Sequence, residues 1–122
     1  MITVLIVEDS PVARDFLQHI LSADPDIQVI GTAHDGEAAI DAVQRRKPDV
    51  ITMDIYMPKM NGFEAVRHIR QHSEVGTTPI IMVTTRGEME NVETGFSSGC
   101  NDYVTKPINA PELMTKLKAL LG

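Results

Sequence analysis

The chain has 122 residues, a single cysteine and a formal net charge of −6, with 43% hydrophobic and 23% charged residues. This length predicts one domain with a buried core, spanning residues 1–122. The acidic balance excludes a basic nucleic-acid-binding surface, so we expect no direct contact with nucleic acid. A lone cysteine cannot form an internal disulfide and indicates a reducing compartment. No signal peptide and no run of membrane-spanning length is evident, so we expect a cytoplasmic protein without a membrane span.

Strand-like and helix-like segments alternate from the N-terminus. An apolar run predicts a strand over residues 3–8, and Ser10 followed by Pro11 predicts the start of a helix that Asp24-Pro25 ends. The apolar residues of this helix recur at fourfold spacing, as Val12, Phe16 and Ile20 and as Leu17 and Leu21. A second strand is predicted at 27–30, where the chain leads to Gly31. A helix follows over 36–46, with Ala39, Ile40 and Val43 facing inward.

The second half of the chain continues the alternation. A third strand is predicted at 50–54, followed by a helix that Asn61 caps and that carries Phe63, Val66 and Ile69 on one face. A fourth strand is predicted at 80–84 and a helix at about 88–97, which has few apolar anchors and should pack weakly. A fifth strand at 102–105 leads to a last helix, whose start is marked by Asn109 and Glu112 at capping-box spacing.

Strand–helix alternation with short connections predicts an α/β fold with a parallel sheet covered on both faces. The strands at 3–8, 50–54 and 80–84 are almost continuously apolar, which is typical of central strands. Those at 27–30 and 102–105 are mixed or short, which is typical of edges. Two edges and three central strands match the doubly wound five-stranded sheet of the flavodoxin-like α/β/α fold, with strand order 2-1-3-4-5. The order of the central strands comes from this fold and not from the patterns.

Polar residues end the predicted strands. Glu8 and Asp9 follow the first strand, Asp54 closes the third, and Thr84 and Lys106 lie at the ends of the fourth and fifth. Carboxyl ends of parallel strands meet at one edge of a sheet, with neighbours roughly 4.8 Å apart. Crowded carboxylates in a partly dry place need a cation to stay ionised. The set therefore favours metal-assisted phosphoryl chemistry.

Two of these carboxylates are candidate metal ligands. If the first and third strands are neighbours, Asp9 and Asp54 can share one hard cation through oxygen atoms. Mg²⁺ suits such a site, with Mn²⁺ as a substitute, because it accepts one or two carboxylates and keeps waters and phosphate oxygens. Glu8 could hold a metal-bound water, and the Tyr56 backbone carbonyl could supply a further oxygen.

A carboxylate can also act as the nucleophile and become an aspartyl phosphate. Asp54 is the candidate acceptor, because it ends an apolar central strand that would hold it rigidly. Lys106 would supply a second cation and Thr84 a hydroxyl donor for the phosphoryl oxygens. Each residue by itself has a common structural explanation, but chance rarely places all of these types at the same end of a sheet.

The chain resembles the receiver domain of two-component response regulators over essentially its whole length. The matching motifs, in order, are Leu5-Ile6-Val7-Glu8-Asp9-Ser10, Met53-Asp54-Ile55-Tyr56-Met57-Pro58 with Asn61-Gly62, Met82-Val83-Thr84-Thr85, and Asp102-Tyr103-Val104-Thr105-Lys106-Pro107.

The resemblance implies roles for individual residues. Asp54 would accept a phosphoryl group from a histidine kinase or a small phosphodonor. Magnesium would be bound directly by Asp9, Asp54 and the Tyr56 carbonyl, and by Glu8 through water. Thr84 and Lys106 would contact the phosphoryl oxygens, Tyr103 would be the aromatic switch, and the Lys106-Pro107 bond would be cis. The bulky Tyr56 suggests slow self-dephosphorylation through steric cover.

The implied function is a phosphoacceptor switch that assists its own phosphorylation and dephosphorylation, without being an enzyme for a separate substrate. Phosphorylation would let Thr84 move inward and Tyr103 rotate, changing a surface for a downstream protein that is made by the helix at 88–97, the fifth strand and the last helix. A stand-alone regulator, of the kind used in chemotaxis, is the expected form.

Other functions stay open with less support. A receiver fragment of a larger regulator with a separate output domain, and a docking module that is never phosphorylated, share this fold. A phosphatase of the haloacid dehalogenase type needs an Asp two residues after its nucleophile, where this chain has Tyr56. A flavodoxin-like cofactor site needs a phosphate-binding loop after the first strand, where Glu8 and Asp9 would repel a phosphate.

Overall fold

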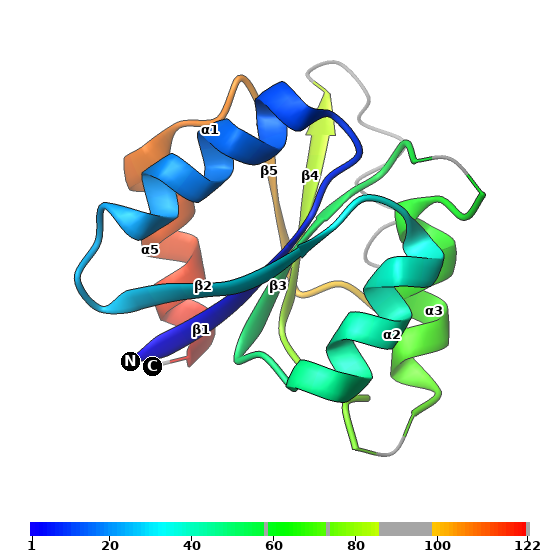
Figure 1. The fold of residues 1–122 in the computed structure, drawn as a ribbon. Helices are drawn as coiled ribbons and strands as arrows, with labels where there is room; N and C mark the ends of the chain where they lie inside the picture. The colour runs from blue at the N-terminus through cyan, green and yellow to red at the C-terminus, as the bar shows by residue number, and fades with distance from the viewer. Residues whose placement is uncertain (58, 73, 86–98, 122) are drawn as a thin grey trace.

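The computed structural model describes residues 1–57, 59–72, 74–85 and 99–121, which form one parallel sheet with helices on both faces (Figure 1). The strand order is β2-β1-β3-β4-β5, so the predicted order 2-1-3-4-5 is confirmed, with β2 and β5 at the edges. The strands are β1 Ile2–Val7, β2 Ile27–Ala33, β3 Val50–Asp54, β4 Ile80–Thr85 and β5 Asp102–Lys106. The helices are α1 Pro11–Ser22, α2 Gly36–Arg46, α3 Gly62–Arg70 and α5 Ala110–Leu121. The predicted helix at 88–97 lies outside the described residues.

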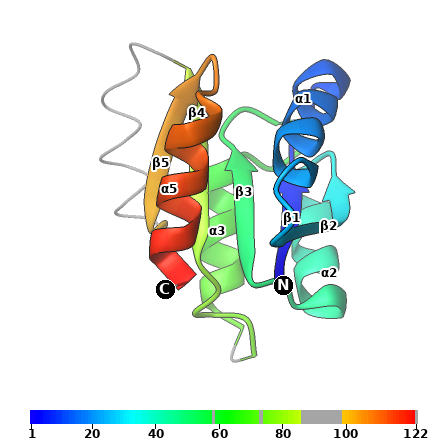
Figure 2. The ribbon, with the colours of Figure 1, turned by 90° about the vertical axis from the view of Figure 1, so that its left-hand side faces the viewer.

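Two apolar clusters fill the space on either side of the sheet. Helices α1 and α5 cover one face and α2 and α3 the other, as Figures 1 and 2 show. Because side chains alternate along a strand, Leu5 and Val7 pack toward α2 and α3, whereas Val4 and Ile6 pack toward α1 and α5. Burial on both faces explains why the three central strands read as continuous apolar runs.

Side-chain caps mark where the helices begin. The Asn61 side chain accepts from the Glu64 backbone N–H, and the Glu64 carboxylate accepts from the Asn61 N–H, which completes a capping box at the start of α3. Ser10 caps α1 and Asn109 caps the first turn of α5 in the predicted way, each by accepting a backbone N–H three residues on. These local signals explain why the predicted helix starts agree with the structure to within one or two residues.

One detail differs from the sequence prediction, and a second one goes beyond it. Strand β2 continues through Gly31 to Ala33 and does not stop at residue 30, because its register against β1 shifts at Val4/Leu5 and pairing then resumes with Gly31 opposite Leu5. In α1, Leu17 and Leu21 are buried, but Val12 is 81% exposed and Phe16 49% exposed. The fourfold spacing therefore includes a second apolar stripe that lies at the surface.

The edge of the sheet where β4 and β5 begin is held by one arginine. Arg70, at the end of α3, donates to the carbonyl oxygens of Gly99, Gly76 and Thr78 and to the Asn101 side chain. Cys100 is buried beside it in the α2/α3 cluster, as expected for a small apolar residue, and burial raises the pKa of its thiol to about 11. Among the described helices, none combines the length and apolarity needed to cross a bilayer.

Candidate functional site

The predicted polar residues lie at the carboxyl ends of the strands. Asp54 is the last residue of β3 and Lys106 the last of β5, while Thr84 is the second-last residue of β4. Glu8 and Asp9 directly follow β1. The arrows of β3 and β5 run in the same direction in Figure 2, so these ends share one edge of the sheet.

Strand register brings the first two acids together. Strands β1 and β3 are neighbours, with Val7 opposite Met53, so the next residues along the two strands, Glu8 and Asp54, are adjacent. The Glu8 backbone N–H still donates to the Ala33 carbonyl, which continues the β1–β2 ladder by one residue. Glu8 is 1% exposed and Asp54 is 7% exposed, so both residues are buried at this edge of the sheet.

Lys106 reaches both carboxylates from the far edge strand. Its Nζ lies 3.1 Å from Glu8 Oε1 and 3.5 Å from Asp54 Oδ1. The three groups come from positions far apart in the chain: Glu8 just after β1, Asp54 at the end of β3 and Lys106 at the end of β5. When both buried carboxyl groups are ionised, the single ammonium leaves the group with a net negative charge.

This geometry alters the proton affinity of the site. Burial and the adjacent Glu8 carboxyl raise the pKa of Asp54, the Lys106 ammonium acts in the opposite direction, and the net result is a pKa of about 7. Burial alone would lower the pKa of Lys106, but the Asp54 and Glu8 carboxylates outweigh that effect and raise it. Lys106 therefore stays charged, whereas metal-free Asp54 titrates near neutrality.

Backbone contacts hold the acids in place. The Ser10 N–H donates to Glu8 Oε2, and the Arg14 guanidinium of α1 donates to the Glu8 carbonyl oxygen. Gly62, the first residue of α3, donates its N–H to the Ile55 carbonyl, and a Cβ added there would overlap the Asp54 carbonyl oxygen. The sequence prediction assigned no contact to Arg14, since nothing in its spacing signals a bond back to the strand end.

The donor set fits a hard divalent cation. Glu8 Oε1 is buried and accepts no hydrogen bond of good geometry from the described residues, although Lys106 lies close to it. Across the four described ranges, no three His, Cys, Asp or Glu side chains form a group that could hold a metal by themselves. Magnesium does not need such a group, because it binds through one or two carboxylates and retains waters.

The remaining predicted site residues lie near this edge in different settings. Asp9 is exposed and Thr84 is buried. Tyr56, two residues after Asp54, is 58% exposed. Tyr103 lies three residues before Lys106 on β5, and its ring is partly buried against the α2/α3 cluster. The Lys106-Pro107 peptide bond is cis, as predicted.

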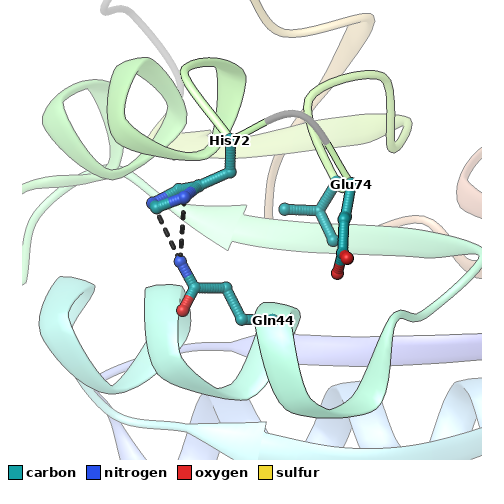
Figure 3. A pocket seen from close by; sticks show the side chains of 4 residues that line it. Gln44, His72 and Glu74 are labelled. Atoms are coloured by element: carbon teal, nitrogen blue, oxygen red, sulfur yellow. Dashed lines mark hydrogen bonds between the residues drawn. The ribbon is translucent and has the colours of Figure 1, made fainter.

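A separate hollow lies at the opposite edge of the sheet. It is lined by Gln44, His72, Glu74 and Val75, and the Gln44 amide contacts the His72 ring between α2 and the segment after α3 (Figure 3). Gln44 is near the C-terminal end of α2, and Val75 precedes β4, so this hollow is remote from the carboxylate pair. Its residues take no part in the arrangement around Asp54.

Comparison with known proteins identifies the family of the chain from nearly its whole length. Residues 4–118 match the family model of the response regulator receiver domain. A protein-glutamate methylesterase/protein-glutamine glutaminase of Nitrosospira multiformis is 55% identical over 98 residues, which cover 80% of this chain and 27% of that protein. The chain thus spans about a quarter of the length of this curated relative.

Solved structures agree in fold. The response regulator domain of Thermotoga maritima CheB superimposes with a TM-score of 0.86 at 38% identity, covering 98% of this chain and 95% of that one. The receiver domain of a Pseudomonas aeruginosa sensor histidine kinase, solved with a magnesium ion coordinated in its active-site cleft, gives a TM-score of 0.87 at 30% identity. That match covers 97% of this chain and 95% of the other.

Proposed function

Since the chain belongs to the response regulator receiver family of two-component signal transduction, we propose that Asp54 is its phosphoryl acceptor and that a histidine kinase is its phosphodonor. The observation that carries this proposal is the buried pair of Glu8 and Asp54 sharing the Lys106 ammonium at the carboxyl ends of the strands. We infer that residues 1–122 act as one receiver unit, and that it works in the cytoplasm.

The transfer is a displacement at phosphorus. An Asp54 carboxylate oxygen attacks, a P–O bond forms and the P–N bond of the phosphohistidine breaks, and the imidazole nitrogen leaves with the electron pair and takes up a proton. Lys106 offsets the charge on the phosphoryl oxygens, and the Thr84 hydroxyl donates a hydrogen bond to one of them. Asp54 must be ionised to attack, so its proton has to leave first.

Magnesium would be held by residues of this same edge. Asp9, Asp54 and the Tyr56 carbonyl would bind the ion directly, and Glu8 would bind it through water. When bound, the ion supplies positive charge that offsets the crowding of carboxylate and phosphoryl oxygens. The residues present fit this role because all their donor atoms are hard oxygens.

Phosphorylation then changes a protein-binding surface. Thr84 moves toward the new phosphoryl group, Tyr103 turns into the space it leaves, and the surface that includes β5 and α5 is altered for a downstream protein. A shift from a 1:99 to a 99:1 population needs about 5.5 kcal/mol of differential stabilisation, which several charge-assisted contacts can approach. The chain itself is a switch that assists its own phosphorylation and dephosphorylation, and we propose chemotaxis as the process that it serves.

Radiolabel transfer tests the acceptor. With labelled acetyl phosphate and Mg²⁺, the wild-type chain should take up label, and Asp54→Asn should take up none. Asp41→Asn, which changes an exposed carboxylate of α2, is the matched control and should label normally. Labelling of Asp54→Asn at the wild-type level would show that another residue is the acceptor, and no labelling of the wild type would leave only a docking module.

A second form of the same proposal is a receiver that belongs to a longer protein, and the greater length of the relatives favours it. The matched part is about a quarter of the Nitrosospira methylesterase, and in this second form the receiver controls an output domain within one longer chain. The mass of the protein in its native host, compared with that of the 122-residue chain, distinguishes this form from a stand-alone regulator.

A further inference from the structure

The edge strand β5 carries a lysine contact that the phosphoryl chemistry does not use. Lys116 of α5 places its Nζ 4.7 Å from the centroid of the Tyr103 ring. The same ammonium donates a hydrogen bond of 2.6 Å to the Tyr103 carbonyl oxygen and lies 3.6 Å from Asp102 Oδ1. Three groups of two consecutive residues on β5 thus meet one cation.

The path of this side chain makes the contact specific to one ring orientation. The Tyr103 ring packs against the cluster beneath α2 and α3, whereas α5 packs on the other face through Leu113 and Leu117. Lys116 must therefore pass around the outer edge of β5 to reach the ring. Its side chain is 28% exposed, and a partly desolvated ammonium binds an aromatic face more strongly than a fully hydrated one.

We propose that Lys116 is a positioning residue for the aromatic switch, which holds the Tyr103 ring in the orientation of the unphosphorylated receiver. This inference rests on the proposed function, in which Tyr103 turns when Asp54 is phosphorylated. The hydrogen bond to the Tyr103 carbonyl and the ion pair with Asp102 hold the Lys116 ammonium in place. A Tyr103 ring that turns away therefore loses its contact with this ammonium. The contact therefore favours the orientation of the Tyr103 ring in which it is made. Phosphorylation has to stabilise the turned orientation by more than the contact contributes.

The size of the effect follows from the contact itself. Loss of one partly exposed cation–π contact should change the ratio of the two ring orientations by about two- to fivefold. By linkage, a ligand that favours the turned orientation should then bind more tightly by up to that factor. Beryllium fluoride, which mimics a phosphoryl group on a carboxylate, is such a ligand.

Fluorine NMR of protein containing 3-fluorotyrosine follows the binding of beryllium fluoride and the turning of the Tyr103 ring in one experiment. The chain has two tyrosines, and Tyr56→Phe assigns their signals. The Tyr56 signal, two residues from Asp54, reports bound beryllium fluoride, and the Tyr103 signal reports the ring. Titrations with beryllium fluoride at saturating Mg²⁺ are compared for the wild type, Lys116→Met and Lys116→Arg.

In Lys116→Met, which keeps the length of the side chain and removes the charge, the apparent affinity for beryllium fluoride should rise about two- to fivefold. Before any beryllium fluoride is added, the Tyr103 signal should already lie part of the way toward its bound position. Lys116→Arg, which keeps a cation and N–H donors, should restore wild-type behaviour. Lys118→Met, which removes a lysine of the same helix that pairs with Asp24, is the matched control and should change neither readout.

The possible failures are distinguishable. If the wild-type ring responds to beryllium fluoride but Lys116→Met binds it with unchanged affinity, the inference is wrong and the proposed switch stands. If Tyr56 reports binding while the Tyr103 signal stays still, the switch is wrong and the inference falls with it. If the wild-type Tyr56 signal does not respond either, phosphoryl acceptance itself is contradicted.

Discussion

Asp54 combines two properties that oppose each other in the metal-free protein. It lies beside the Glu8 carboxyl in a buried position, which raises its pKa to about 7, yet a phosphoryl acceptor must be ionised. Between about pH 4 and pH 7 the unfolded chain therefore loses a proton that the folded chain keeps. Folding stability attributable to this carboxyl falls as the pH rises through that window.

The pH dependence gives a prediction for Asp54→Asn. In metal-free buffer, the substitution should raise the free energy of unfolding more at pH 8 than at pH 4, with a difference on the order of 2 kcal/mol. Urea denaturation of the two proteins at both pH values measures it. Equal effects at the two pH values would show that the carboxyl is not held in its neutral form by the fold.

Tyr56 gives a second prediction at the level of one side chain. We propose that its ring, two residues after Asp54 in the chain, covers the path by which water approaches the acyl phosphate. Tyr56→Asn should shorten the lifetime of the phosphorylated protein by roughly five- to tenfold, which corresponds to about 1 kcal/mol of activation free energy. Loss of radiolabel with time measures the rate, and Tyr56→Phe, which retains the ring, should decay like the wild type. An unchanged lifetime in Tyr56→Asn would exclude steric cover.

At the level of elements, the start of α3 lies directly against the end of β3. Its first residue, Gly62, leaves no room for a Cβ beside the Asp54 carbonyl oxygen, and the backbone atoms concerned cannot move without shifting either element. The capping box of Asn61 and Glu64 holds the helix start in that place. A side chain at this position would separate α3 from the end of β3.

Gly62→Ala should therefore lower the free energy of unfolding by about 1–3 kcal/mol, despite the better helix propensity of alanine. Gly31→Ala on β2 is the matched control, because its Cβ would meet the flexible end of the Arg46 side chain at 3.4 Å, which can move aside. Urea denaturation midpoints compare the two. A Gly62→Ala protein as stable as the wild type would contradict the close seating of α3.

At the scale of the whole molecule, the strand ends carry a negative site that only the complete sheet assembles. A cation that binds this site in the folded chain and not in the unfolded one stabilises the fold by mass action. At a concentration a hundredfold above its dissociation constant, Mg²⁺ should add about 2.7 kcal/mol and raise the melting temperature by several degrees.

This prediction is checked by thermal unfolding with Mg²⁺ and then with a chelator added, which should reverse the rise. Asp9→Asn should weaken the response, since Asp9 is proposed as a direct ligand. Asp15→Asn, which changes an exposed acid of α1, should keep it. An identical melting temperature with and without Mg²⁺ would contradict the proposed metal site.

Much of this architecture is readable from local patterns. Hydrophobic periodicity predicted the order of helices and strands, and continuous or mixed apolar runs separated the central strands from the edges, because burial on one or two faces shapes composition directly. Caps such as Asn61 predicted helix starts, since those contacts join residues only three positions apart. The sequence also predicted that the polar residues at the strand ends lie at one edge of the sheet, because the carboxyl ends of parallel strands meet there.

What the tertiary structure alone decided depends on contacts between distant positions. No pattern in the chain states that β1 lies beside β3, that Lys106 reaches both Glu8 and Asp54, or that Lys116 lies over Tyr103. The extension of β2 was missed for the same reason, and the spacing of Val12 in α1 did not indicate whether it is buried or exposed. Periodicity reports that a residue is apolar, but which surface it meets is set by packing among elements far apart in sequence.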